Sequence, residues 1–541
     1  MHAVTAFNLV LISLIAIIAL EVLARRLRLP PAAALLIGGV AMAFVPGLPK
    51  FELDPELVLV VFLPPLLMYG AYFFVWDDFK RNLSGILLLA IGAVAFTTFV
   101  VGVAVHLVVP SLPWAACFAL GAVVSPPDAV AAKAVLERVA LPRRLMVLLE
   151  GESLLNDAAG LVLFRFALVA AMSGVFSAPR AVASFAGLAI GGVVVGIVAG
   201  YIAVKLMRAL ADDYLVITTS MLTAWVSYMA GEMLGVSSVI ATVTCGMMVG
   251  WHQHEVFSAA QRMRGTAFWQ VVVFVLEALV FVLIGLSLRG IALRLGGVGD
   301  AFSLLGPASA AVIGVVIVSR FVWVFGVEGL KGIVWTLKGR KHANAGADAE
   351  DARAMKPDWR AATVVSWAGM RGVVTLAVAL SLPEDMPGRD LILFAGFAVI
   401  LVTVLLQGAT IGPLIKWLAL AAGHERSARH LSEPQAWARM ETAQLAAIQP
   451  LVRDANGEVI HPRLLEQYTY RADLSSRFQN EEDFPTEARH AHYGVVLAAI
   501  AAGRAELLKM HRGGQIHDEL LHSLERDLDL QEIIALHSRG A

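Results

Sequence analysis

A succession of apolar runs, each close to the length that crosses a bilayer, constrains this chain of 541 residues more than any other feature. A membrane-spanning helix needs about 20 mostly apolar residues, because the hydrocarbon offers its backbone no hydrogen-bond partners. The candidate runs cover residues 7–24, 30–47, 56–75, 83–109, 114–136, 145–172, 180–204, 214–232, 237–250, 267–288, 303–330, 361–382 and 390–418. The sequence therefore predicts an all-α polytopic membrane protein with about 13 transmembrane helices. The first run has no basic segment before it, which predicts a span and not a cleaved signal.

Charged residues are unevenly spread along the chain. Residues 1–420 carry 54 of them and residues 421–541 carry 31. The second stretch is about a quarter charged, as soluble domains are. We therefore expect a transmembrane domain over 1–420 and a helical cytoplasmic domain over 421–541. An apolar stripe at helical spacing in the second domain is formed by Ile516, Leu520, Leu524 and Leu528.

Other features of the composition exclude several classes of protein. The net charge of −1 gives no indication of nucleic-acid binding. Two cysteines are too few for a disulfide framework or a cysteine-based zinc site. Nine of the 14 histidines lie in the tail. They could sense cytoplasmic pH, although solvated surface histidines are the commoner case.

Basic residues in the loops predict the orientation. Loops after odd-numbered spans hold 20 Lys and Arg residues, whereas the opposite side holds five. The positive-inside rule then places the N-terminus outside and the tail in the cytoplasm. The segment 339–358 reads as a polar cytoplasmic linker on the same side.

Thirteen spans divide into two six-helix halves around one extra helix, which would invert the second half. Many secondary transporters are built in this way. The fifth helix of each half, the fifth and twelfth of the chain, is interrupted, at 125–128 (Ser-Pro-Pro-Asp) and at 369–372 (Gly-Met-Arg-Gly). Matching broken helices indicate an ion site near the membrane midplane. The other interpretation, ordinary Pro and Gly in membrane helices, carries about equal weight for either break alone.

The densest group of polar residues lies early in the sixth span, at 150–157 (EGESLLND). Residues four apart share a face of a helix. Ser153 and Asp157 thus offer a hydroxyl and a carboxylate, hard oxygen ligands that suit a hard cation. Glu152 and Asn156 share a second face, where they could brace an ion pair. The alternative is a polar patch that only fastens helices together.

Two arginines lie inside apolar spans, Arg320 in the eleventh and Arg371 at the break in the twelfth. A buried arginine stays charged and needs a carboxylate or carbonyl partner. Glu152 is a suitable partner for either. Asp128 lies at the break in the fifth span, where backbone carbonyls could also face an ion. No functional role is assigned to Arg165, Glu232, Glu277, His106, His252 or His254.

Three strings, SPPDAVAA, EGESLLNDAAGLVLF and WAGMRGVVTLA, resemble the monovalent cation:proton antiporters of the sodium–proton exchanger type in their bacterial form. The resemblance covers the whole membrane domain. It implies an inverted-repeat fold of thirteen helices, a homodimer in the bacterial inner membrane and an elevator-like motion. The transported substrates it implies are Na⁺ and H⁺.

The resemblance also implies roles for individual residues. Asp157 binds the cation or the proton, and Asn156 and Glu152 support it. Arg320, in the eleventh helix, is selected over Arg371 as the partner of Glu152. The positions that match the lining of the cation site are Ser153, Asp128 and the carbonyl of Pro127.

The chain departs from the family pattern at three points. Relatives have Thr-Asp-Pro where this chain has Pro-Asp-Ala at 127–129. In the third span, at 63–69, Tyr69 stands where a glutamate near the site is usual. The pair at 156–157 is Asn-Asp and not Asp-Asp, which in the wider family accompanies electroneutral exchange.

The mechanism expected from these residues needs one carboxylate and two competing ligands. A carboxylate that is partly removed from water can hold a proton at neutral pH, whereas a solvated one seldom does. No lysine follows a glycine, so a phosphate loop is absent, and neither an enzyme nor a cofactor is expected. The alternatives are a K⁺/H⁺ antiporter, a transporter of organic or anionic substrates, and a membrane sensor without transport. Whether Na⁺, Li⁺ or K⁺ is preferred stays open.

Overall fold

The computed structural model describes most of the chain, with gaps between its segments. The described residues are 3–27, 29–45, 58–128, 141–173, 178–294, 298–338, 357–420, 431, 433–454, 456–477 and 486–540. They fall into two compact units, Met1–Gly423 and His424–Ala541. The second part of the fifth predicted span, 129–136, and the predicted linker up to residue 356 lie outside the described residues.

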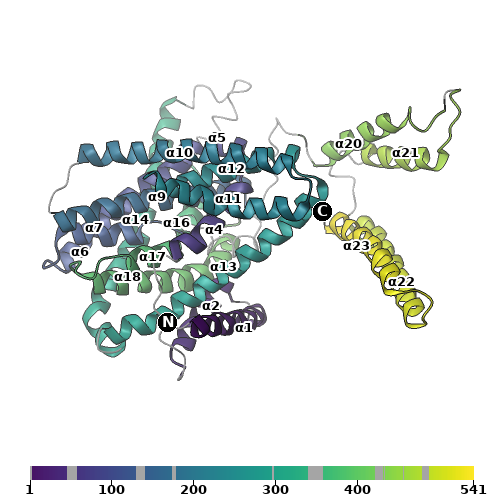
Figure 1. Cartoon of the computed structure of the whole chain (residues 1–541). Helices are drawn as coiled ribbons and strands as arrows, with labels where there is room; N and C mark the ends of the chain where they lie inside the picture. Colours follow the sequence, from purple (N-terminus) through teal and green to yellow (C-terminus); the bar gives the residue numbers. More distant parts are fainter. Residues whose placement is uncertain are drawn as a thin grey trace. The chain divides into compact units, whose positions relative to one another are not determined.

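The first unit is a bundle of helices, some of them straight and some interrupted (Figure 1). Its elements are α1 (Ala3–Leu27), α2 (Pro31–Ala43), η1 (Val58–Phe62), α4 (Leu63–Tyr72), α5 (Trp76–Leu87), η2 (Leu88–Ala93), α6 (Val94–Val108), α7 (Trp114–Val124), α9 (Arg143–Ser173), α10 (Ala178–Ala209), α11 (Asp213–Met233), α12 (Ser238–Val256), α13 (Ala259–Arg294), α14 (Val298–Lys338), α16 (Trp359–Trp367), α17 (Val373–Leu380), α18 (Arg389–Val402), η4 (Thr403–Gln407) and α19 (Gly408–Trp417). The segments η1, η2 and η4 are π-helical turns within longer helices. Where the structure describes it, each predicted apolar run coincides with a helix or with consecutive helical segments. Among the described residues there is no strand, only an isolated bridge between Arg453 and Val459. The all-α prediction is confirmed.

Among the described residues, seven helices are long enough and apolar enough to cross a membrane. Six lie in the first unit and cover Trp76–Val108, Arg143–Met172, Val182–Ala209, Ala259–Leu288, Ser303–Ile333 and Arg389–Trp417. Shorter apolar helices accompany them at Pro31–Ala43, Leu59–Tyr72 and Trp114–Val124. The seventh, His490–Arg512, belongs to the second unit and has the lowest mean hydropathy of the set, 1.2.

The end of α7 meets the break between α16 and α17. Helix α7 ends just before Pro126 and Pro127, which lack the backbone N–H that would continue it. The backbone N–H of Asp128 donates to the carbonyl of Met370, in the break between α16 and α17, at 2.6 Å. A Cβ atom at Gly372 would overlap the Asp128 carboxylate, so only glycine allows this approach.

Glycines also bring α2 and α13 into close contact. A Cβ atom at Gly285 would lie 2.5–2.7 Å from backbone atoms of Leu36, Gly39 and Val40. A Cβ atom at Gly39 would overlap the carbonyl of Val282 in turn. Small residues allow this kind of backbone contact between membrane helices, where packing and not the hydrophobic effect holds the helices together.

The second unit consists of two helical hairpins. Its helices are α20 (Glu433–Ile448), α21 (Pro462–Arg477), α22 (Thr486–Arg512) and α23 (Asp518–Gly540), and α20 packs on α21 and α22 on α23. Arg504 pairs with Asp529 and Glu532, each at 2.6 Å. The predicted apolar stripe is only partly covered, because Leu520 and Leu524 remain 40% and 39% exposed. The spacing of the apolar residues in the sequence identified this face of the helix. It could not show how much of the face the neighbouring helix would bury.

We predict that Gly285→Ala lowers the melting temperature in detergent, because the added methyl group would have to push α2 and α13 apart. Overpacking of this kind costs about 1–3 kcal/mol. Gly314→Ala in α14 is the matched control, since a Cβ atom there meets nothing within 4 Å. Equal melting temperatures for the two variants would contradict the close contact.

Candidate cation site

Helix α9 carries the polar group 150–157 without interruption and presents it on two faces. Glu152 and Asn156 are buried, with 1% and 0% of their surface exposed. Ser153 and Asp157 are partly exposed. The four-residue spacing therefore separates a buried pair from a pair that can be reached, as the sequence indicates.

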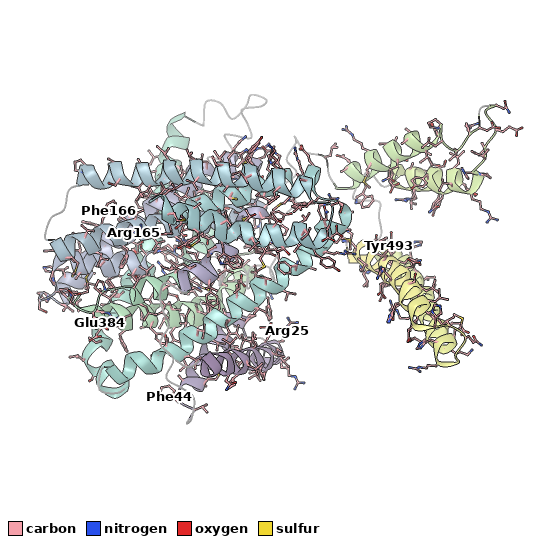
Figure 2. All side chains as sticks on the ribbon, in the orientation of Figure 1. Arg25, Phe44, Arg165, Phe166, Glu384 and Tyr493 are labelled. Atoms are coloured by element: carbon pink, nitrogen blue, oxygen red, sulfur yellow. The ribbon has the colours of Figure 1, made fainter. Side chains whose placement is uncertain are left out.

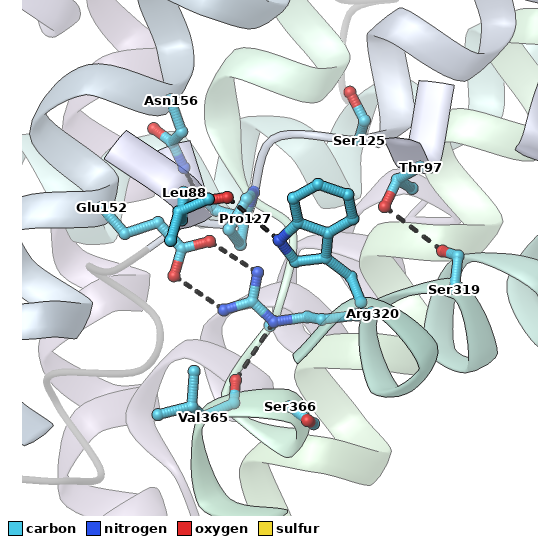
Figure 3. A network of polar contacts seen from close by, with 12 residues as sticks. Leu88, Thr97, Ser125, Pro127, Glu152, Asn156, Ser319, Arg320, Val365 and Ser366 are labelled. Atoms are coloured by element: carbon cyan, nitrogen blue, oxygen red, sulfur yellow. Dashed lines mark hydrogen bonds and ion pairs between the residues drawn. The ribbon is translucent and has the colours of Figure 1, made fainter. Parts of the chain in front are cut away.

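Glu152 forms a two-point ion pair with Arg320 of α14 (Figure 3). The two Nη atoms of the arginine donate to the two carboxylate oxygens at 2.6 and 2.7 Å. Its Nε donates to the carbonyl of Val365 in α16 at 3.1 Å. Bidentate charged contacts are the strongest hydrogen bonds in proteins and fix orientation as well as distance. The pair therefore ties α9, α14 and α16 together.

Arg371 contacts backbone carbonyls instead of a carboxylate. Its Nε donates to the carbonyl of Val124 at 2.9 Å and one Nη to that of Ser125 at 3.3 Å, and its other Nη bonds the carbonyl of Gly369. The carbonyl end of a helix carries partial negative charge, which a cation stabilises. Arg371 therefore neutralises the end of α7. Its own backbone N–H donates to the hydroxyl of Thr403 at 3.1 Å.

Asn156 connects α9 to the break after α7. Its side-chain N–H donates to the carbonyl of Pro127 (Figure 3). The amide oxygen is buried and, among the described residues, has no hydrogen-bond partner. The Pro127 carbonyl, expected as a cation ligand, thus accepts one hydrogen bond and keeps one lone pair for another contact.

Asp157 directly follows Asn156 on α9 and, among the described residues, takes no part in these hydrogen bonds. The charged neighbour that acts on it is Asp128, from the break after α7. Within the part of the chain that the structure describes, no arginine or lysine forms an ion pair with Asp157. Two carboxylates in such a place create a negative potential that attracts cations.

The remaining sequence candidates lie in other surroundings. Tyr69 lies on α4 with its ring edge-on to Phe73, 4.9 Å between centroids, and 6.5 Å from the ring of Trp269. His106 stacks on Trp114 at 3.9 Å. His252 bonds the carbonyl of Met248 one turn earlier, and Glu277 is partly buried on α13. Arg165 and Glu232, to which the sequence assigned no role, form an ion pair at 3.8 Å.

Several hydroxyl groups around the breaks were missed by reasoning from the sequence. Thr403 accepts from the backbone of Arg371, Thr98 donates to Ser125 at 3.0 Å, and Ser319 donates to Thr97 at 3.2 Å. The last contact joins α14 to α6 close to Arg320 (Figure 3). The only sequence signal for these contacts was a hydroxyl residue inside an otherwise apolar span. That signal is weak, because a Ser or Thr hydroxyl in a membrane helix often bonds a carbonyl of its own helix.

We predict that Glu152→Gln and Arg320→Ala each lower stability and activity strongly. Removing one partner of a buried pair leaves an uncompensated charge, at a cost of about 3–5 kcal/mol. The double variant should lose less than the sum of the single losses. Melting temperature in detergent and exchange rate in proteoliposomes measure the effect.

The control for this cycle is Arg143→Ala, which removes the exposed partner of Asp78 at 2.8 Å. An exposed pair contributes about 0–1 kcal/mol, so little change is expected. Strict additivity of Glu152→Gln and Arg320→Ala would argue against the contact. Coupling of Glu152 to Arg371 instead would reassign the partner.

Comparison with known proteins agrees with this architecture. Residues 10–417 match the family described as sodium/hydrogen exchanger, transmembrane. The chain is 34% identical over 394 residues to the sodium, potassium, lithium and rubidium/H⁺ antiporter of Bacillus subtilis (strain 168). That alignment covers 68% of this chain and 55% of the relative, so the chain spans little more than half of the relative's length.

Two further proteins align with this chain over nearly their whole length. The Na⁺/H⁺ antiporter NhaP of Pseudomonas aeruginosa is 32% identical over 429 residues, which is 74% of this chain and 94% of that protein. The structure of the sodium proton antiporter MjNhaP1 from Methanocaldococcus jannaschii superposes with a TM-score of 0.59 at 18% identity. That match covers 77% of this chain and 99% of the other, and it shows the shared fold. The resemblance of the three sequence motifs is thereby confirmed, and the chain belongs to the sodium/hydrogen exchanger family.

Proposed function

We propose that this chain is a secondary antiporter that exchanges Na⁺ for H⁺ across the cell membrane by alternating access. One observation carries the proposal. Asp157 is a partly exposed carboxylate inside the membrane domain, with Asp128 as its charged neighbour, while both buried arginines have other partners. A carboxylate in that position is costly unless it binds a cation or a proton.

The proposed cation shell consists of hard oxygen atoms, the ligands that hard cations prefer. The carboxylates of Asp157 and Asp128, the Ser153 hydroxyl and the free lone pair of the Pro127 carbonyl supply it. Asn156 and the Glu152–Arg320 pair hold these groups in place without binding the ion. Because one carboxylate takes either one Na⁺ or one H⁺, exchange is one-for-one and electroneutral.

Alternating access follows from the interrupted helices. The breaks after α7 and between α16 and α17 touch through the Asp128–Met370 hydrogen bond. Arg320 joins α16 to α9 and α14, Asn156 joins α9 to the segment after α7, and Arg371 joins that segment to the break before α17, so we expect these elements to move as one body. Rocking such a body against the rest of the bundle exposes the site to each side in turn.

The protein is a multi-pass membrane protein of a family with bacterial members. Its place in the bacterial inner membrane, an outside N-terminus, a cytoplasmic tail and a homodimer are parts of the proposal, together with a role in pH homeostasis. Although α22 is long enough to cross a bilayer, Arg504 in its middle is paired with two carboxylates of α23. Such a charged contact suits water, which supports a cytoplasmic tail.

Two other functions compete with Na⁺/H⁺ exchange. The Bacillus relative is named as an antiporter of sodium, potassium, lithium and rubidium, which supports a chain that also accepts K⁺ or Li⁺. A membrane sensor without transport belongs to a different class and would not require two neighbouring carboxylates, one on α9 and one after the end of α7. Dissipation of a pH gradient in proteoliposomes by NaCl, KCl or LiCl distinguishes the three, because a sensor dissipates none.

We predict that Asp157→Asn reduces Na⁺-dependent exchange below about a tenth of the wild-type rate, because the amide keeps the shape of aspartate without its charge or its proton. The rate of pH-gradient dissipation in proteoliposomes measures it. Glu255→Gln is the matched control, since Glu255 pairs with Arg208 at 3.2 Å and 71% of its side chain is exposed. Exchange above that level in a correctly inserted Asp157→Asn protein would refute the assignment.

A further inference from the structure

A cavity of about 420 Å³ lies between α9, α11, α12 and η1. One water needs only roughly 10–15 Å³ of such space, so the cavity can hold several waters or a hydrated ion. Helix α9 lines it with Ala158, Leu161 and Arg165. These positions recur every three or four residues and therefore form one face of the helix. Asp157 does not itself line the cavity, but it lies one helical turn before Leu161 on the same side of α9, so the cavity ends close to the proposed cation ligand.

An ion pair lies in the wall of this cavity. Arg165 (labelled in Figure 2) approaches Glu232 of α11 to 3.8 Å, and their side chains are 60% and 40% exposed. The Ser238 hydroxyl donates to the Glu232 carboxylate at 2.8 Å, and Tyr228 shares a side-chain hydrogen bond with Ser238. The carboxylate is therefore held in place, whereas the arginine makes only a long, exposed contact with it.

The charges of this pair can act on the cation site. Arg165 lies eight residues after Asp157, which is roughly 12 Å along a helix. At that distance one unpaired charge changes the local concentration of a monovalent cation by about two- to tenfold, depending on how much water intervenes. In the Arg165–Glu232 pair the two opposite charges largely cancel each other's electrostatic effect on the site. If one partner is removed, the charge of the other is no longer cancelled.

We propose that this cavity is the route by which Na⁺ reaches Asp157 from one face of the membrane, and that Arg165 and Glu232 together set the cation concentration in it. Glu232 attracts the cation and Arg165 limits that attraction, so that the ion passes on to Asp157 and is not trapped. The inference rests on the proposed function. With the orientation inferred from the loop charges, the route opens to the outer face, where α9 and α11 end.

A pair that only fastened α9 to α11 would behave differently. Losing either partner would then have the same sign of effect, a lower stability, with no preference for one side of the membrane. An electrostatic role predicts opposite signs for the two partners. The direction of the change therefore separates the two explanations.

The test is the apparent KM for Na⁺ at each face, measured in right-side-out and inside-out membrane vesicles. At the outer face, Glu232→Gln should raise KM and Arg165→Gln should lower it, each by about two- to tenfold. The double variant and Arg165→Lys should return to near the wild-type value. Arg208→Gln, which breaks the exposed pair with Glu255, is the matched control and should leave KM unchanged.

Two results overturn the inference: shifts of KM in the same direction for the two single variants, or an unchanged outer KM in proteins that insert normally. If Glu232→Gln does not fold, Arg165→Gln alone decides by the sign of its shift. The proposed function is tested separately by the wild-type protein. Wild-type vesicles without Na⁺-dependent exchange refute the function, whereas normal wild-type exchange with unshifted variants refutes only the route.

Discussion

The buried Glu152–Arg320 pair is the interaction on which the rest of the site depends. Neither charge could remain in the membrane domain alone, because an unpaired charge there is very costly. With two hydrogen bonds between them and a third to the carbonyl of Val365, both charges are compensated. The pair consequently fixes the rotation of α9, and this rotation turns Ser153 and Asp157 away from the buried face.

A second buried cation balances the backbone at the breaks. Arg371 donates hydrogen bonds to the carbonyls of Val124 and Ser125, which have no partner within the helix where α7 ends. Because it is engaged in this way, its charge does not form an ion pair with Asp157. Both arginines are thus used for structure, and neither forms an ion pair with Asp157, the residue that we propose binds the transported ion. This division is what would let the proposed site bind a cation despite the two nearby arginines.

Much of the fold could be predicted because membrane spans depend on a local property, the apolar length of a segment. The two faces of α9 and the breaks near Pro126 and Gly372 follow from spacing and from backbone chemistry. The contacts across space could not be predicted in the same way. Spacing left Glu152 with two possible arginines, and nothing local indicated that Thr403 or the Pro127 carbonyl would be occupied by other groups. The same limit hid the Arg165–Glu232 pair, whose partners lie on different helices.

The central claim is that one carboxylate holds Na⁺ and H⁺ in turn. The most direct measurement counts the protons released when Na⁺ binds to the purified protein, by titration calorimetry in buffers with different ionisation enthalpies. Since linked ligands displace each other reciprocally, the account predicts proton release on Na⁺ binding at pH values where the site is protonated, and none in Asp157→Asn. Binding of Na⁺ to the wild-type protein at such pH values without any proton release would contradict it.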